Sequence, residues 1–205
     1  MTEEMGYPNF KLAMKAIREG RLDFYHEKSK TIKGNDFAQK ILMWLAEETL
    51  DWPLTDEQER KHHTCRLYRR GYGEIVEAFN MLAVPEEAYK HLPTREEQLN
   101  AYIELVNARK RTAESRIRDA FRRMTERGLL TCIQNPVKGR NYGAYMLLLG
   151  DDAENNEILD YNRACLLEMY KAHVYEPVTR RAEPEDDATN PWIETDNNDD
   201  SVWGL

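Results

Sequence analysis

One stretch in the second half of this 205-residue chain constrains the fold more than any other. Five apolar residues recur there at the spacing of one helix face: Ala113, Ile117, Ala120, Phe121 and Met124. This spacing indicates an amphipathic helix over 113–127, and Gly128 stands just past its end as a C-cap. Residues 129–134 and 142–149 are apolar and are separated by a turn-forming segment, so we expect an antiparallel hairpin after this helix.

Apolar periodicity and capping residues predict further helices on both sides of this stretch. Their predicted ranges are 9–18 with Asn9 as a cap, 36–50 with Asp36 as a cap, 55–82 with Gly71 and Gly73 in its middle, 94–106 and 155–173. Thr94 and Glu97 form a capping box at the start of one of them. We expect a short polar link at 107–111 before a helix capped by Thr112, whereas residues 21–35 look polar and irregular.

Charge is segregated along the chain, whose formal net charge is −8. Residues 107–141 contain ten Lys/Arg and three Asp/Glu, a local charge of +7, while residues 151–205 carry −11. Residues 182–205 have eight acidic and no basic side chains, which predicts a disordered acidic tail. Such asymmetry is typical of a basic binding face joined to an acidic appendage.

Several classes of protein are disfavoured by the sequence. It contains no run of 18 apolar residues and no apolar secretory signal, so we expect a protein without a membrane segment. Three widely spaced cysteines favour the reducing cytoplasm over a disulfide framework. Catalytic motifs are absent, which predicts a non-enzyme without a cofactor. His62, His63 and Cys65 converge poorly as metal ligands, because adjacent helical residues point about 100° apart.

The segment from Thr112 to Leu130 resembles the recognition helix of winged-helix regulators, which often passes through an acidic-basic-Gly-Leu step into the wing. The flanking helices resemble, more loosely, those of MarR-like dimeric repressors. The resemblance covers roughly residues 70–150. It implies a mainly α-helical winged helix-turn-helix with a two-stranded β-wing, flanking helices and the acidic tail. The expected parts are an N-terminal helical extension (1–54), the winged helix-turn-helix domain (55–150), a C-terminal helix (151–176) and the tail (177–205).

This arrangement predicts duplex-DNA binding by residues of the helix, the link and the wing tip. Arg118 and Arg122 are expected to read guanine edges, and Ser115 a phosphate or base. The remaining candidates are the link residues Arg109, Lys110, Arg111 and Thr112, the helix flank Arg116 and Arg123, and the wing-tip residues Lys138, Arg140 and Asn141. The protein would then be a transcriptional regulator or a phage or plasmid replication or maintenance factor.

Alternatives remain open at this stage. The winged helix can be a protein-interaction subunit of a larger nucleoprotein complex, or the acidic regions can imitate DNA and inhibit a basic partner. The tail ends in Val202, Trp203 and Leu205 after acidic residues, a composition suited to docking a protein, competing with DNA or only solubilising. A homodimer is also expected, with apolar side chains of flanking helices at its interface: Trp44, Phe79, Leu166, Met169 and Tyr170.

Overall fold

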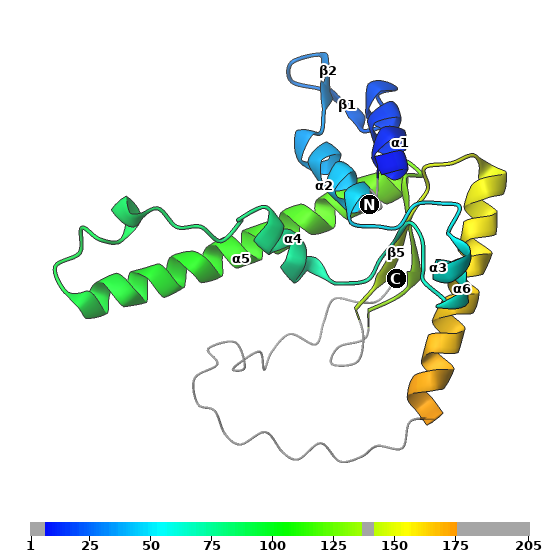
Figure 1. The fold of residues 1–205 in the computed structure, drawn as a ribbon. Helices are drawn as coiled ribbons and strands as arrows, with labels where there is room; N and C mark the ends of the chain where they lie inside the picture. Colours follow the sequence, from blue (N-terminus) through cyan, green and yellow to red (C-terminus); the bar gives the residue numbers. More distant parts are fainter. Residues whose placement is uncertain (1–6, 137–141, 176–205) are drawn as a thin grey trace. The chain divides into compact units, whose positions relative to one another are not determined.

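A computed structural model describes residues 7–136 and 142–175 of the chain, and it is mainly helical, as predicted (Figure 1). The helices are α1 (Tyr7–Arg18), α2 (Asp36–Glu47), α3 (Asp56–Arg60), α4 (Tyr72–Ala78), the 3-10 turn η1 (Glu86–Ala88), α5 (Arg95–Glu126) and α6 (Asp152–Tyr175). The strands are β1 (Asp23–His26), β2 (Thr31–Gly34), β3 (Leu67–Tyr68), β4 (Leu130–Gln134) and β5 (Ala144–Leu147). The chain divides into two compact units, 1–168 and 169–205, and the described part of the second is the end of α6.

The longest element corrects the prediction of two helices joined by a link. α5 is one continuous helix of 32 residues, and residues 107–111 lie inside it (Figure 1). The capping box at its start is present, with Thr94 Oγ1 accepting from the Glu97 backbone N–H at 3.2 Å. Thr112 caps nothing, because its hydroxyl donates to the Ala108 carbonyl at 3.0 Å within the helix. Lys, Arg and Ala are good helix formers, so a polar sequence alone does not end a helix.

The main core lies where α2 and α4 pack against the C-terminal half of α5. The predicted inward face of α5 is confirmed, since its five apolar residues are all buried: Ala113, Ile117, Ala120, Phe121 and Met124. Trp44 packs edge-on against Tyr68 and Phe79, with ring centroids 5.6 and 6.2 Å apart. Two of the side chains predicted for a dimer interface, Trp44 and Phe79, are partly buried and pack against the core of the same chain.

A three-stranded sheet combines β3, which precedes α5, with β4 and β5, which follow it; β5 lies between β3 and β4, and both pairings are antiparallel. The hairpin predicted from residues 129–149 is confirmed as β4 and β5. The third strand was not predicted, because residues 55–82 were expected to form a helix. They form the short helix α3, the strand β3 and the helix α4 instead.

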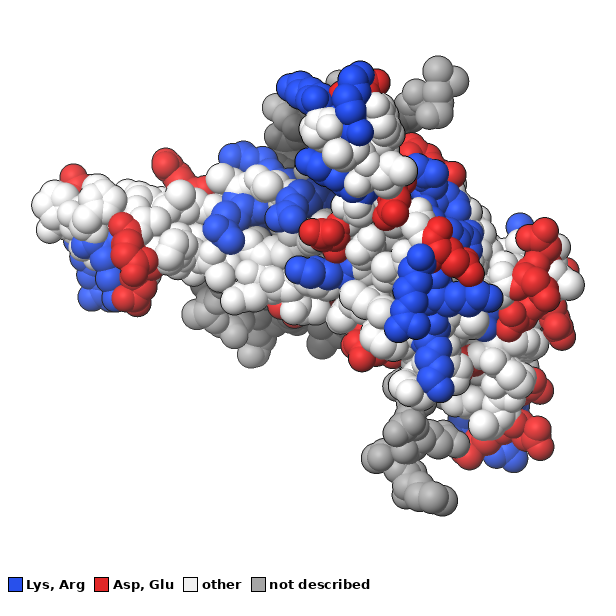
Figure 2. Space-filling view, turned by 90° about the horizontal axis from the view of Figure 1, so that it is seen from above, with Lys and Arg blue, Asp and Glu red and all other residues white. Residues whose placement is uncertain are grey.

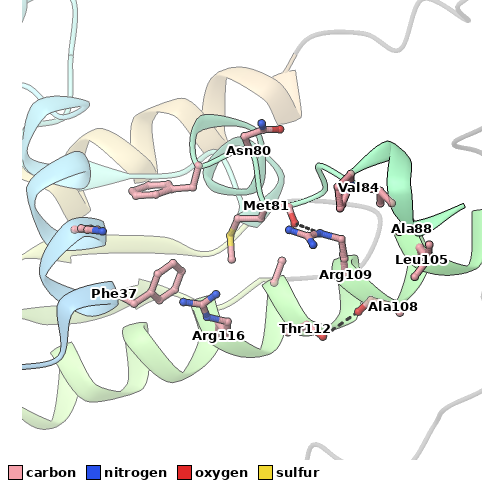
Figure 3. Close-up of a pocket in the computed structure, with 14 residues that line it drawn as sticks. Phe37, Asn80, Met81, Val84, Ala88, Leu105, Ala108, Arg109, Thr112 and Arg116 are labelled. Carbon is pink, nitrogen blue, oxygen red and sulfur yellow. Dashed lines mark hydrogen bonds between the residues drawn. The ribbon is translucent and has the colours of Figure 1, made fainter. Parts of the chain in front are cut away.

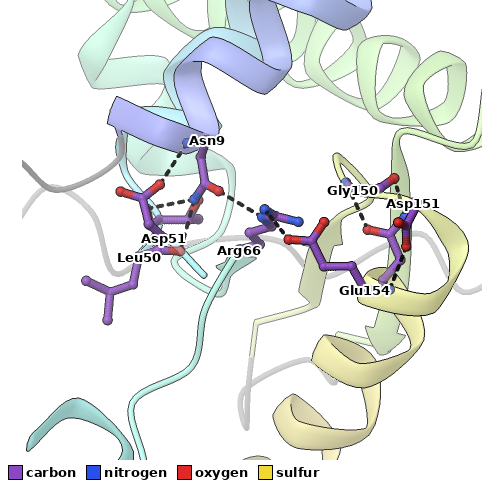
Figure 4. Close-up of polar contacts among 9 residues, drawn as sticks. Asn9, Leu50, Asp51, Arg66, Gly150, Asp151 and Glu154 are labelled. Carbon is purple, nitrogen blue, oxygen red and sulfur yellow. Dashed lines mark hydrogen bonds and ion pairs between the residues drawn. The ribbon is translucent and has the colours of Figure 1, made fainter. Parts of the chain in front are cut away.

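A buried polar network ties four parts of the chain together around Arg66 (Figure 4). Arg66 is 1% exposed; its Nε donates to Asn9 Oδ1 at 2.8 Å and its Nη2 pairs with Glu154 Oε1 at 3.0 Å. Asn9 in turn donates to the Leu50 carbonyl at 3.0 Å. Asn9 therefore lies within α1 as a buried link and is not the predicted cap. The bonds of Nε and Nη2 offset part of the desolvation of this buried guanidinium, whereas Arg66 Nη1 is buried without a hydrogen-bond partner among the described residues.

Residues 21–35, expected to be irregular, form the hairpin of β1 and β2. Tyr25 pairs with Ile32 across the strands, and both side chains are exposed. The base of the hairpin is joined to the end of α5, where Arg127 Nη2 donates to the Asp23 carbonyl at 2.8 Å. The N-terminal extension is therefore not purely helical. The predicted acidic tail, residues 177–205, lies outside the described residues.

Candidate nucleic-acid interface

The outer face of α5, opposite the buried stripe, carries four of the predicted DNA-contacting residues. All four are exposed, and they follow one another at intervals of one helical turn: Arg111, Ser115, Arg118 and Arg122. Because the helix rises about 1.5 Å per residue, this row extends for roughly 16 Å along one side. A helix that presents such a row can lie in the major groove of B-DNA, which is about 12 Å wide.

Acidic neighbours on the same face reduce its positive charge. Arg122 pairs with Glu126 at 2.8 Å and with Asp119 at 3.4 Å. The hydrogen bond that Arg122 donates to the Glu126 carboxylate is the largest cause that raises the pKa of Arg122 above its ordinary value. Arg122 must exchange these carboxylates for a base edge to read DNA as predicted. Exposed ion pairs of this kind contribute little to stability and are weakened by salt, so breaking them to bind a base requires little free energy.

Three other predicted contacts are directed away from the outer face, onto the body of the protein. The Arg116 guanidinium lies over the Phe37 ring at 4.3 Å, and that of Arg123 lies over Phe24 at 5.4 Å. Arg109 Nε donates to the Met81 carbonyl at 3.1 Å. Cation–π stacking and these hydrogen bonds anchor the flanks of α5 to its neighbours, which leaves these cations less able to reach a groove.

Arg109 and Arg116 help to line an open groove of about 650 Å³ between α2, α5 and the segment after α4 (Figure 3). Its floor is mainly apolar, with Phe37, Phe79 and Leu105 among the lining residues. The charged lining residues are Lys40, Arg109 and Arg116, all of them basic. The sequence did not predict this groove, because it forms where the segment 79–88 lies beside α5. The prediction had divided α5 into two helices at 107–111.

Of the predicted residues not yet placed, Lys110 lies on α5 and three are not described by the structure. Lys110 is exposed and lies on the same side of α5 as Ile103, not on the outer face. Lys138, Arg140 and Asn141, at the predicted wing tip, lie outside the described residues. Tyr142, the next described residue along the chain, is 67% exposed.

The hairpin of β1 and β2 presents exposed lysines that the sequence interpretation overlooked. It carries three exposed lysines, Lys28, Lys30 and Lys33, beside the exposed pair of Tyr25 and Ile32. The alternation of side chains in 23–26 and 31–34, around a polar turn, was the available signal. Figure 2 shows Lys and Arg in several groups separated by Asp and Glu, so the face in view is not uniformly positive.

Other kinds of site find little support in the structure. Among residues 7–136 and 142–175, no group of three or more His, Cys, Asp or Glu side chains is arranged to hold a metal ion. Burial raises the pKa of the Cys65 thiol to about 12, which keeps this cysteine protonated and a poor ligand or nucleophile at neutral pH. None of the helices in the described part combines the length and apolar character of a bilayer span.

Comparison with known proteins assigns no family. No protein-family model matches the chain, and neither the curated proteins nor the solved structures include a match. The resemblance to winged-helix and MarR-like regulators therefore stays a prediction.

Proposed function

We propose that this chain is a duplex-DNA-binding protein, and that residues 36–150 form a winged helix with α5 as its recognition helix. The order α2, α3, β3, α4, η1, α5, β4, β5, with β5 between β3 and β4, supports this proposal. Apart from the five-residue helix α3 and the 3-10 turn η1, it matches the helix, strand, helix, helix, strand, strand succession of winged helices. In this arrangement the turn before the recognition helix is the segment 79–94, and residues 107–111 belong to the recognition helix.

The row of Arg111, Ser115, Arg118 and Arg122 on the outer face of α5 is the observation that carries the proposal. Arg118 and Arg122 are suited to guanine edges, where a bidentate contact contributes about 1–3 kcal/mol of discrimination. Arg111 and Ser115 are placed to contact phosphates, which fix the position of a helix on the duplex without reading sequence. A transcriptional regulator or a replication or maintenance factor would use such a surface.

The experiment is selection of bound sequences from a random duplex library with the full chain. We expect enrichment of a short motif, and loss of preference at single positions for Arg118→Ala and Arg122→Ala. Arg163→Ala, an exposed arginine on α6, is the matched control and should retain the wild-type motif. Absence of any enriched sequence for the wild-type protein contradicts sequence-preferring binding.

A second candidate function, docking a protein partner within a nucleoprotein complex, is favoured by the groove. An apolar floor edged by Lys40, Arg109 and Arg116 suits a peptide that combines apolar and acidic side chains. Under this function, partner affinity survives Arg118→Ala and falls for Lys40→Glu. A DNA-imitating inhibitor, the third possibility from the sequence, would bind no duplex and would instead be titrated by a basic protein.

A further inference from the structure

One apolar stripe runs along almost the whole of α5, and only its C-terminal half is covered. Its positions alternate at three- and four-residue spacing, and all are apolar except Glu96 and Lys110: Glu96, Leu99, Ile103, Val106, Lys110, Ala113, Ile117, Ala120 and Met124. Ala113, Ile117, Ala120 and Met124 are at most 2% exposed, whereas Leu99 is 56% and Ile103 is 47% exposed. This spacing is the pattern by which one helix packs along another.

The neighbouring segment of the same chain covers a different side of this N-terminal half. Gln98 Nε2 donates to the Leu92 carbonyl at 2.8 Å, and the Tyr89 and Tyr102 rings meet edge-on at 5.2 Å. These contacts hold the connector against α5 and leave Leu99 and Ile103 open to solvent. Exposed aliphatic side chains at coiled-coil spacing on an ordered helix are typical of a surface that packs against another helix.

The charges at the two ends of the exposed stripe indicate the identity and the orientation of the helix that packs against it. Glu96 and Lys110 lie seven residues before and seven after Ile103, each about 10 Å from it along the axis. Two copies of this segment placed antiparallel bring Glu96 of one chain beside Lys110 of the other, twice. A parallel pair would place Glu96 against Glu96 and Lys110 against Lys110.

We infer that a second copy of this chain covers the stripe, through an antiparallel contact of the two α5 helices around a two-fold axis near Ile103. A two-fold axis makes one patch complementary to itself, as these charges are. The contact spans about 21 Å of each helix. A contact between two such short helical segments buries less surface area than an interface of standard size. Dimer formation is therefore expected to depend on concentration. This surface differs from the one predicted from Trp44, Phe79, Leu166, Met169 and Tyr170 and is independent of DNA binding.

Sedimentation equilibrium of the full chain over a wide concentration range tests the contact. The wild-type protein should pass from monomer to dimer, whereas Ile103→Lys should stay monomeric at concentrations at least tenfold higher. Leu99→Ser should weaken the dimer in the same direction. Ile32→Lys changes an isoleucine that is 73% exposed on β2 and is the matched control, with wild-type association expected. Circular dichroism establishes that each variant is folded.

Charge exchange tests the orientation. Glu96→Lys and Lys110→Glu should each raise the dissociation constant at least tenfold, and the double variant Glu96→Lys/Lys110→Glu should restore it. A wild-type protein that is monomeric throughout, or one whose dimer survives Ile103→Lys, overturns the inference. Single charge variants that associate like the wild type overturn the antiparallel arrangement.

Discussion

The two halves of α5 have the same apolar periodicity and opposite surroundings. From Ala113 to Met124 the stripe is buried beneath α2, α4 and the sheet. From Leu99 to Ile103 the same stripe is about half exposed, on a part of the helix that projects past the core (Figure 1). Apolar periodicity therefore predicts which face of a helix packs against another surface. Whether the partner comes from the same chain depends on the rest of the fold.

Removing side-chain volume from each half should give the largest difference. Ile117→Ala creates a cavity at a fully buried site and should lower the free energy of unfolding by about 2–5 kcal/mol. Ile103→Ala, at a half-exposed site, should cost below about 1 kcal/mol when the protein is monomeric. Urea denaturation of dilute protein measures both, and equal losses would remove the distinction between the halves.

The continuity of the helix between the halves can be broken directly. Ala108→Pro removes a backbone hydrogen bond from the interior of α5 and should cost about 3 kcal/mol or more. Arg95→Pro, at the first helical position, is the matched control, because a proline is tolerated there. Unfolding curves should separate the two variants; an Ala108→Pro protein as stable as the wild type would indicate that residues 107–111 form a turn.

Removing the N-cap at the start of the exposed half of α5 should have the smallest effect on stability. Thr94→Ala removes the capping hydroxyl and should lower helix stability by about 1 kcal/mol. Because few core contacts hold this half, we expect faster amide hydrogen exchange over 96–106 and a nearly unchanged urea midpoint. Thr125→Ala, whose hydroxyl donates to the Phe121 carbonyl in the covered half, serves as the comparison. Exchange that increases equally along all of α5 would contradict this view.

What the sequence predicted correctly depends on local rules. The inward face around Ile117, the capping box at Thr94 and the pairing of β4 with β5 all follow from spacing and from turn or capping residues. The prediction of a link at 107–111 was wrong, because these residues are polar as exposed positions of a continuous helix and do not mark the end of one. Leu67 and Tyr68 were placed in a helix, although their pairing with β5 is a long-range contact that no local pattern signals.

The candidate site was predictable in its composition and less so in its geometry. Placing Ser115, Arg118 and Arg122 on the face opposite the core needed only the helical repeat. The stacking of Arg116 on Phe37 and of Arg123 on Phe24 depends on partners about 80 and 100 residues away in the sequence. Such contacts decide which arginines remain available for a ligand, and they follow only from the tertiary structure.

Binding of a labelled duplex, followed by fluorescence anisotropy across a series of salt concentrations, tests the central proposal most directly. The wild-type protein should lose affinity steeply with salt, because each phosphate contact releases condensed counterions. Arg111→Ala should reduce the slope of log affinity against log salt by about 0.9, the value for one lost phosphate contact, and Arg163→Ala should leave it unchanged. A protein that binds no duplex at low salt, or whose slope is the same in all three forms, contradicts DNA recognition by the outer face of α5.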